Sequence, residues 1–344
     1  MSLLWLSAIL AFALGFSAYR ASICTVAAVA EVMSSRTGRV FLSFAKVVGW
    51  VLLVNGLLVW WMPDLARPVK PQPGLLMALI GGLVFGIGAA VNGGCGFSTI
   101  SKIAQGNIHM AMTLPAFVIG VSAGAVLLAW IDTGASLTTP WVGEQTGLVL
   151  LLLLGLWGVW EIVEIIGPNL RGDGIWRGIS AGRYRLSTGA AIVGICSGGI
   201  YALHGRWAYS SQLVDAFIER PGLPSAEGHI AGWLFLALLA GAIVSAVSNR
   251  QFSFSFDKDM WLRNLIGGFL MGAGAMLVPG GNAALILQDL PTLSVHAIVA
   301  YLAMILGIGM TLMLFRRVTG ASMTVSCGGD LCSVDKTRAT TRRS

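Results

Sequence analysis

Residues 81–89 read Gly-Gly-Leu-Val-Phe-Gly-Ile-Gly-Ala, and residues 267–275 read Gly-Gly-Phe-Leu-Met-Gly-Ala-Gly-Ala, 186 residues further along the chain. Four glycines occupy the same positions in both copies of this otherwise apolar run. Small residues let transmembrane helices pack closely, and lipid keeps such segments helical because it offers the backbone no other hydrogen-bond partners. The two copies therefore predict a helical membrane protein built from two related halves.

The composition agrees with this class. Of the 344 residues, 56% are hydrophobic and only 11% are charged, and the mean hydropathy is +0.80. A soluble globular domain carries about a quarter charged residues, so that class is excluded. The net charge of +7 would suggest a nucleic-acid partner in a soluble protein, but here the basic residues lie in short loops and at the C-terminal end. There they report membrane topology, so we expect the lipid bilayer, and no nucleic acid, as a partner.

About nine segments are long and apolar enough to cross a hydrocarbon core of roughly 30 Å at about 1.5 Å per residue. They lie near residues 3–30, 40–62, 75–92, 110–131, 147–166, 187–204, 230–248, 264–280 and 295–315. No charged region precedes the first segment, so we interpret it as a mature helix and not as a signal peptide. The expected fold class is an all-α polytopic membrane protein with about nine transmembrane helices.

The loop charges predict the orientation. Lysine and arginine are concentrated in the loops at 36–46, 171–185 and 250–263 and after residue 316, which share one side if nine spans are counted. By the positive-inside rule, the N-terminus lies outside the cytoplasm and the C-terminus inside. We expect a multi-pass protein of the cell inner (plasma) membrane.

The 186-residue register extends beyond the glycine-rich copies. It pairs Arg20 with Arg206, and each arginine is followed by a cluster of small residues. An odd number of spans separates the two starts, so the second copy enters the membrane from the opposite side and the repeats are inverted. The expected division is a first repeat with a linking helix at 1–170, a second repeat at 187–318 and a polar cytoplasmic tail at 319–344.

A short glycine-rich break interrupts each copy. Residues 92–96 read Asn-Gly-Gly-Cys-Gly, and residues 278–282 read Val-Pro-Gly-Gly-Asn. Inverted-repeat transporters hold their substrate near the bilayer midplane, where such broken helices end. The N–H groups of a restarting helix also form a site for an anion. We therefore expect the two breaks to face one another across a central neck.

Residues 15–25, Gly-Phe-Ser-Ala-Tyr-Arg-Ala-Ser-Ile-Cys-Thr, together with 92–96 and the following Gln105-Gly106-Asn107, resemble the two N-terminal signatures of the YeeE/YedE family of sulfur-compound transporters. The resemblance covers most of residues 1–318. It implies an hourglass-shaped importer of thiosulfate, in which cysteines along a central path pass the ligand sulfur by weak S–H···S contacts. By this resemblance Cys24 and Cys95 are the relay thiols.

The sequence departs from the family pattern at one position. The family has a further cysteine in the second repeat, where the register with Cys95 places Gly281, and no cysteine occurs between Cys196 and Cys327. The relay is short by one thiol, so another sulfur- or selenium-containing oxyanion stays open as the substrate. Cys196, near the start of the sixth span, could partly substitute.

The candidate substrate-binding residues are Arg20, Cys24, Gly93, Gly94, Cys95, Gly96, Arg206, Gly280, Gly281 and Asn282. Each type has a structural alternative. A buried free cysteine can simply pack as a small apolar residue, and the two arginines can extend to opposite interfaces instead of attracting an anion. Four residues separate Arg20 from Cys24, so a continuous helix would place both on one face.

We expect no metal ion, no cofactor and no disulfide framework, because neither the five cysteines nor the four histidines show metal-ligand spacing. The chain lacks the phosphate-binding loop Gly-x-x-x-x-Gly-Lys-Ser/Thr, so we expect no primary pumping within it.

The favoured function is a transporter and not an enzyme. One rival is a membrane-embedded sulfurtransferase that forms a persulfide on Cys95, and another is a structural subunit with a degenerate pore. The tail is expected to be polar and mobile. Its thiols, Cys327 and Cys332, could contact a cytoplasmic sulfur-carrier or sulfurtransferase partner.

Overall fold

The structure is a computed structural model. It describes residues 2–62, 74–129, 144–171, 181–205, 207–208, 210, 226–278, 280–320, 322–328 and 330–337.

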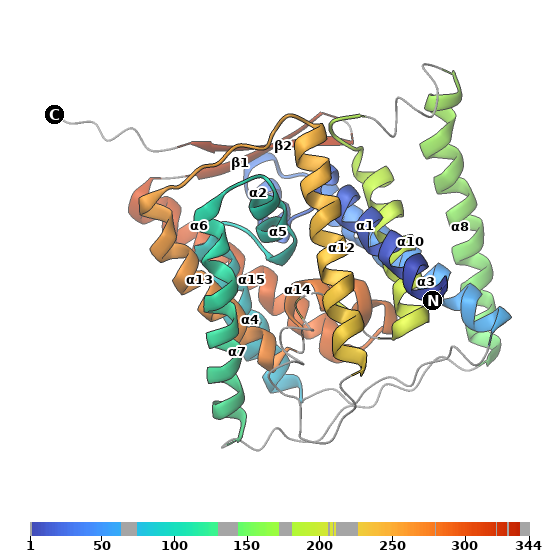
Figure 1. The fold of residues 1–344 in the computed structure, drawn as a ribbon, viewed down its shortest axis with the longest axis horizontal. Coiled ribbons are helices and arrows are strands. Elements are labelled where there is room, and N and C mark those ends of the chain that lie inside the picture. Colours follow the sequence, from blue (N-terminus) through green and yellow to red (C-terminus); the bar gives the residue numbers. More distant parts are fainter. Residues whose placement is uncertain are drawn as a thin grey trace.

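Helices form almost all of the described chain (Figure 1). They are α1 (Ser2–Ala21), α2 (Thr25–Ser35), α3 (Arg39–Trp61), α4 (Leu75–Asn92), α5 (Gly96–Ala104), α6 (Ile108–Ala111), α7 (Thr113–Ala129), α8 (Glu144–Arg171), α10 (Leu186–His204), α12 (Ala226–Ser248), α13 (Lys258–Leu277), α14 (Gly281–Ala284), the π-helical turn η2 (Leu285–Asp289), the 3₁₀ turn η3 (Leu290–Thr292) and α15 (Val295–Thr319). Two strands, β1 (Ser322–Gly328) and β2 (Leu331–Thr337), follow.

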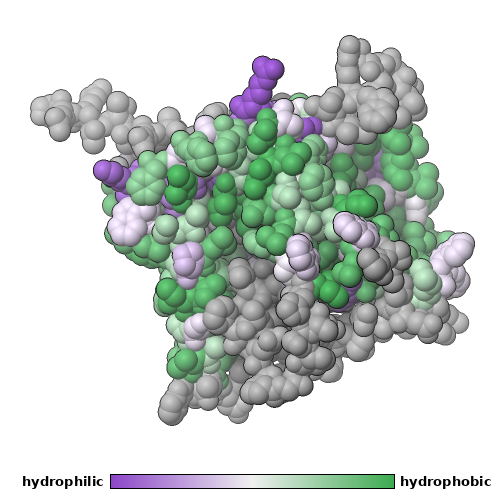
Figure 2. Space-filling view, viewed as in Figure 1, coloured by the Kyte–Doolittle hydropathy of each residue, from purple (hydrophilic) through white to green (hydrophobic). Residues whose placement is uncertain are grey.

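Eight helical segments in the described ranges are long and apolar enough to cross a membrane, and a ninth is counted if the bent pair 260–277 and 281–292 is one span. Each of the nine predicted spans coincides with one of these segments, so the all-α polytopic membrane class is confirmed. The outer surface agrees: Trp61 and Leu156 are 80% and 72% exposed. Figure 2 shows apolar side chains covering the face over α12, with hydrophilic residues along the edge near the hairpin. An apolar surface of this extent suits a lipid environment.

Glycines set the closest helix contacts. A Cβ atom at Gly86 of α4 would collide with the carbonyl of Met304 in α15, and a Cβ at Gly272 of α13 would collide with the carbonyl of Phe117 in α7. Gly86 and Gly272 are related by the 186-residue register. The same register relates two further packed pairs, α1 with α12 and α10 with α3. Related helices thus pack in related ways, while the inversion of the second copy and the domain division stay predictions.

Three spans in the described part of the chain are broken by a short interruption of the helix. The first breaks between α1 and α2, where Ser22 has φ = 50°, and the second breaks between α4 and α5 at Gly93, where φ = 72°. The third lies between α13 and α14. Because α1 ends at Ala21, no continuous helix joins Arg20 to Cys24. The prediction that these two side chains share one helix face is wrong, since a backbone break reorients everything after it.

The prediction of a mobile tail is also wrong for residues 322–337. Strands β1 and β2 form an antiparallel hairpin in which Cys327 faces Cys332, and a disulfide joins the two cysteines. Val325 is 2% exposed and packs into the main core. At the turn, the backbone oxygen of Asp330 accepts from the amide of Leu186 at 2.9 Å, at the N-terminus of α10. The tail is ordered because its alternating apolar residues and its turn find partners on the helices, which composition alone cannot show.

Candidate functional site

The two relay thiols predicted from the first repeat lie in direct contact. Cys24 is the N-cap residue of α2, and Cys95 is the N-cap residue of α5. Their Sγ atoms are 3.6 Å apart although 71 positions separate them in the chain. Both are free thiols, with Cys95 fully buried and Cys24 8% exposed. Two helix breaks thus build one buried dithiol site.

The surrounding backbone favours negative charge at this site. A helix N-terminus carries a partial positive charge, because the amide groups of its first turn have no partner within the helix. Two such ends, those of the 11-residue α2 and the 9-residue α5, begin at the two touching thiols. The thiol pair therefore lies in a field that would stabilise an anion.

Ser98 and Lys102 extend the site along α5. The Cys24 thiol donates to Ser98 Oγ at 3.3 Å, and Lys102 Nζ donates to the carbonyl of Gly93 at 2.7 Å. Both residues follow the first break at 92–96 within six positions, yet sequence reasoning did not select them. Ser98 lies three positions after Cys95, and Lys102 lies four positions after Ser98. This spacing is the signal that places all three residues on one helix face.

Asn92 holds the first break in shape. Its Nδ2 donates to the carbonyl of Gly94 and to Thr99 Oγ1, both at 2.9 Å, while its Oδ1 accepts from Thr113 at 2.8 Å. The side chain is 1% exposed, so these bonds form in a dry setting where each unpaired group would be costly. Asn92 is a positioning residue for the glycine turn.

The second break reaches the thiol pair from the other copy. Thr25, next to Cys24, donates to Asn282 Oδ1 at 2.9 Å. Gly280 and Gly281 have φ values of 89° and 65°, and Ser210 donates to the carbonyl of Gly280. The register pairs Ser210 with Cys24. Where the first copy presents thiols, the second presents a hydroxyl, an amide and two glycines.

A cavity of about 710 Å³, hereafter the vestibule, adjoins the first break. Its lining includes Gly93 together with four basic side chains, Lys102, His109, Arg263 and Arg316. Among the described residues of this lining, Asp257 is the acidic one. The balance of charge is positive, which favours the entry or exit of an anion.

A second cavity of about 30 Å³ lies next to Gly96, Thr99, Ser210 and Asn282. Gly93 lines the vestibule and Gly96 lines this small cavity, so Cys95 lies between the two along the chain. Residues of both copies line this small cavity, which adjoins the first break.

Comparison with known families decides the class of this protein. A family model described as sulphur transport matches residues 20–310, a range that contains both breaks and both thiols. The chain belongs to this sulphur transport family. The resemblance noted at residues 15–25 and 92–107 is thereby confirmed, and no curated protein matches the chain. With its membrane-spanning helices, this family member is a membrane transporter of a sulfur compound.

Arg20 of the transporter lies away from the vestibule lining. Its guanidinium donates to Ser245 and Ser248 of α12, at 3.2 and 3.0 Å, and to the carbonyl of Ala181 at 2.8 Å. The group also lies 4.3 Å from the centre of the Phe16 ring. These contacts join α1 to α12, so the structure favours a packing role, and a role of Arg20 toward substrate stays a prediction. Arg206 lies outside the described residues.

The remaining cysteines of the transporter do not join the neck. Cys196 is buried within α10 and stays a free thiol. In the described part of the chain, the group with the geometry to hold a metal ion is Glu31 with Cys327 and Cys332. The two sulfur atoms of this group are joined in the disulfide.

Proposed function

We infer that this transporter imports thiosulfate, and that the ligand passes between the thiols of Cys24 and Cys95. The observation that carries this proposal is the 3.6 Å contact between two free thiols at the N-termini of two half-helices. Thiosulfate is an anion with a polarisable terminal sulfur. The thiols offer S–H donors to that sulfur, while the helix ends offer positive potential to its charge.

Transport also needs weak binding, because an ion held too tightly does not leave. The S–H groups meet this requirement, since they are weak donors and are already satisfied by each other and by Ser98 when no anion is bound. An entering thiosulfate replaces these contacts with similar ones. The exchange costs little in either direction, which suits passage through a neck.

The neck in this proposal is lined unequally by the two inverted copies. Gly93, Gly94 and Gly96 let the first break approach the ligand, and Gly280, Gly281 and Asn282 form the opposite wall. The proposed orientation places the N-terminus outside the cytoplasm and the vestibule on the cytoplasmic side of the inner membrane. There the anion is released to a sulfur-carrier or sulfurtransferase partner.

Uptake into proteoliposomes tests the substrate. Thiosulfate, sulfite, sulfate and selenite are offered separately to vesicles containing the purified chain, and vesicles without protein provide the baseline. We expect thiosulfate uptake to exceed sulfate uptake by at least about tenfold, which corresponds to about 1.4 kcal/mol, because sulfate lacks the polarisable terminal sulfur that the thiols contact in this proposal. Selenite uptake above that of thiosulfate would identify selenite as the preferred substrate. Equal uptake of all four anions would contradict the proposal that the thiols select the ligand.

Lys102 provides a separate prediction about the vestibule. Lys102→Met is expected to reduce thiosulfate uptake by about fivefold to tenfold at low salt, because removing one cation weakens the attraction for a divalent anion. Uptake by the parent chain should fall as ionic strength rises, and the variant should show a weaker fall. Lys102→Arg, which keeps the charge, is the matched control and should retain the salt dependence. Identical salt curves for Lys102→Met and the parent chain would argue against an electrostatic role.

The contact between the thiols also favours a second candidate function. A sulfurtransferase that forms a persulfide on Cys95 needs a resolving thiol, and Cys24 lies at the required place. Incubation of the purified chain with thiosulfate labelled at the terminal sulfur, followed by mass spectrometry of the Cys95 peptide, separates the two functions. A stable gain of one labelled sulfur would support the enzyme, and an unmodified peptide from a chain active in uptake would support transport.

A further inference from the structure

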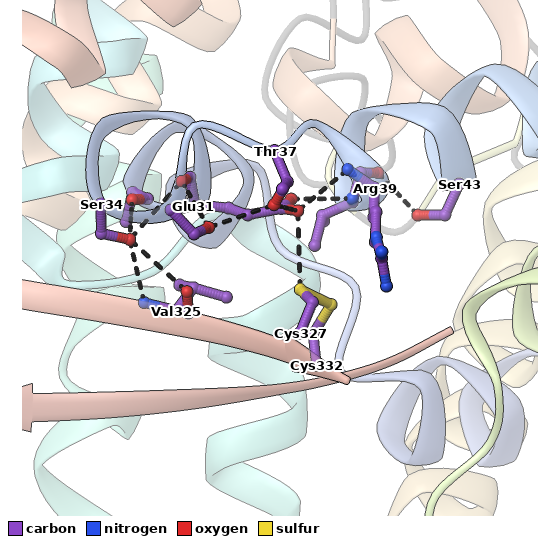
Figure 3. The surroundings of a disulfide bond; sticks show 11 residues. Glu31, Ser34, Thr37, Arg39, Ser43, Val325, Cys327 and Cys332 are labelled. Atoms are coloured by element: carbon purple, nitrogen blue, oxygen red, sulfur yellow. Dashed lines mark hydrogen bonds between the residues drawn. A yellow bond between two sulfur atoms is a disulfide. The ribbon is translucent and has the colours of Figure 1, made fainter. Parts of the chain in front are cut away.

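The disulfide of the C-terminal hairpin joins β2 to β1, a strand that reaches the vestibule. Met323 and Thr324 of β1 line the vestibule. Cys327 follows four residues later on the same face of the strand as Met323, about 14 Å away at about 3.4 Å per residue. Figure 3 shows the disulfide directly below Glu31 of α2, with Ser34 bonded to Val325 on one side. Cys327 and Cys332 are both partly exposed.

The disulfide is not needed to hold the hairpin in place. Seven residue pairs connect β1 with β2, and Cys327 and Cys332 already face each other across this ladder. Ser34 holds the middle of the hairpin, and Asp330 holds its turn on α10. A disulfide stabilises least when the loop it closes is short, and here the two cysteines are only five positions apart. Reduction would leave both thiols facing each other.

Glu31 provides a polar partner for the sulfur. Its side chain is fully buried, and Oε1 lies 3.5 Å from Cys327 Sγ. The same carboxylate accepts from Thr37 at 2.6 Å and from the amides of Arg39 and Val40 at 2.9 Å. These bonds fix its position, so a reduced Cys327 would have a carboxylate oxygen in place as a hydrogen-bond acceptor.

We propose that Cys327 and Cys332 form a redox-active dithiol that reduces the sulfane sulfur of the imported anion; this rests on the proposed function. Glu31 positions Cys327, whose thiolate attacks the terminal sulfur of thiosulfate. The S–S bond of thiosulfate breaks, sulfite leaves with the bonding electron pair, and Cys327 carries a persulfide. The Cys332 thiolate then attacks Cys327 Sγ and expels the outer sulfur as hydrosulfide.

The step balances in atoms and electrons. Two thiols and one thiosulfate dianion yield one disulfide, one hydrosulfide and one hydrogen sulfite, and the two thiol protons end on these two products. The cysteines lose two electrons, and the sulfane sulfur gains them. The disulfide in the structure is the oxidised end of this cycle, and a soluble dithiol in the cytoplasm returns it to the reduced form by thiol–disulfide exchange. A reducing compartment suits this use, since disulfides there are catalytic more often than structural.

The test uses the full chain in detergent, so that no membrane has to be crossed. The protein is reduced with a dithiol, freed of the reductant and mixed with thiosulfate, and sulfite and hydrosulfide are measured. We expect one of each per chain, with the tail peptide recovered as the disulfide. Cys327→Ser should release neither product. Cys332→Ser should release sulfite alone and retain a persulfide on Cys327, one sulfur atom heavier. Cys196→Ala, which also removes one thiol, should behave as the parent chain.

Glu31→Gln tests the role of the carboxylate, with an expected reduction of at least tenfold in the rate of sulfite release at neutral pH. A purely structural role would lower the melting temperature and leave that rate unchanged. Sulfite release no greater than that of the Cys327→Ser, Cys332→Ser double variant would overturn the proposal. The proposal would also be overturned if the reduced parent chain bound one zinc ion and the double variant bound none. Glu31, Cys327 and Cys332 would then form a metal site.

Uptake and product release are independent readouts. If sulfite and hydrosulfide are released in detergent but thiosulfate is not taken up by proteoliposomes, thiosulfate is not the transported substrate, and the dithiol reaction is still supported. If thiosulfate is taken up but neither sulfite nor hydrosulfide is released, only the dithiol reaction is contradicted.

Discussion

Thiosulfate uptake is expected to fall by about tenfold to a hundredfold in Cys95→Ala, because a hydrogen bond to a charged group is worth about 1.5–3 kcal/mol. Cys95 is fully buried and touches Cys24, so the substitution removes one of the two S–H donors and leaves the partner without its contact. Uptake of labelled thiosulfate into proteoliposomes measures the effect. The melting temperature of the variant is recorded beside it, because a buried truncation also leaves a small cavity.

The control for this prediction is Cys196→Ala, which removes a buried free thiol from α10 and not from the neck. Its uptake should stay within about twofold of the parent chain, as expected for a substitution distant from the site. Cys24→Ala should resemble Cys95→Ala. The loss of uptake in the double variant, expressed as a free energy, should be smaller than the sum of the losses in the two single variants. The effects of substitutions at contacting residues are not additive. Full uptake in both single variants would end the relay hypothesis.

The second large effect concerns the missing thiol of the second copy. The register suggests that Gly281→Cys would restore the relay, but the structure predicts misfolding. Gly281 has φ = 65°, and a Cβ atom there would collide with the ring of Phe85. Backbone strain costs on the order of 1–3 kcal/mol, and overpacking of a filled core adds a similar amount. We expect a low yield of folded protein and a lower melting temperature.

Ser210→Cys is the better way to add a thiol. Ser210 is the register partner of Cys24, lies buried beside Gly280 and already carries a side chain of nearly the same shape. We expect this variant to fold, with a melting temperature close to that of the parent chain, and to raise thiosulfate uptake severalfold. Size-exclusion elution, melting temperature and uptake are compared for the two variants. Normal folding of Gly281→Cys with wild-type stability would contradict the packing seen around Phe85.

The sequence predicted the membrane helices well because their signal is local and strong. Lipid forces a long apolar run to become helical, and all nine predicted spans coincide with described segments. The two glycine-rich breaks at 92–96 and 278–282 were equally visible, because glycine and proline act on their own backbone. The family resemblance at residues 15–25 and 92–107 was confirmed by the sulphur transport match over 20–310.

The failures concern contacts between distant segments. The expected helix face shared by Arg20 and Cys24 does not exist, because the break at Ser22 is decided by packing and not by an interruption that the sequence announces. Arg20 instead contacts hydroxyl groups on α12, more than two hundred positions away. The expected mobile tail folds because Val325 and Asp330 find partners on α2 and α10.

The sequence by itself determined the class of protein, the positions of the spans, the two glycine-rich breaks and the thiols placed there. These are properties of short windows, in which hydrophobicity and backbone freedom act locally. Only the tertiary structure decided that Cys24 and Cys95 touch, that Ser98 and Lys102 join them, that Phe85 closes the space at Gly281, and that the hairpin brings its disulfide to Glu31. Each of these facts depends on how separate helices pack, and packing is set by the complementary shapes of surfaces far apart in the chain.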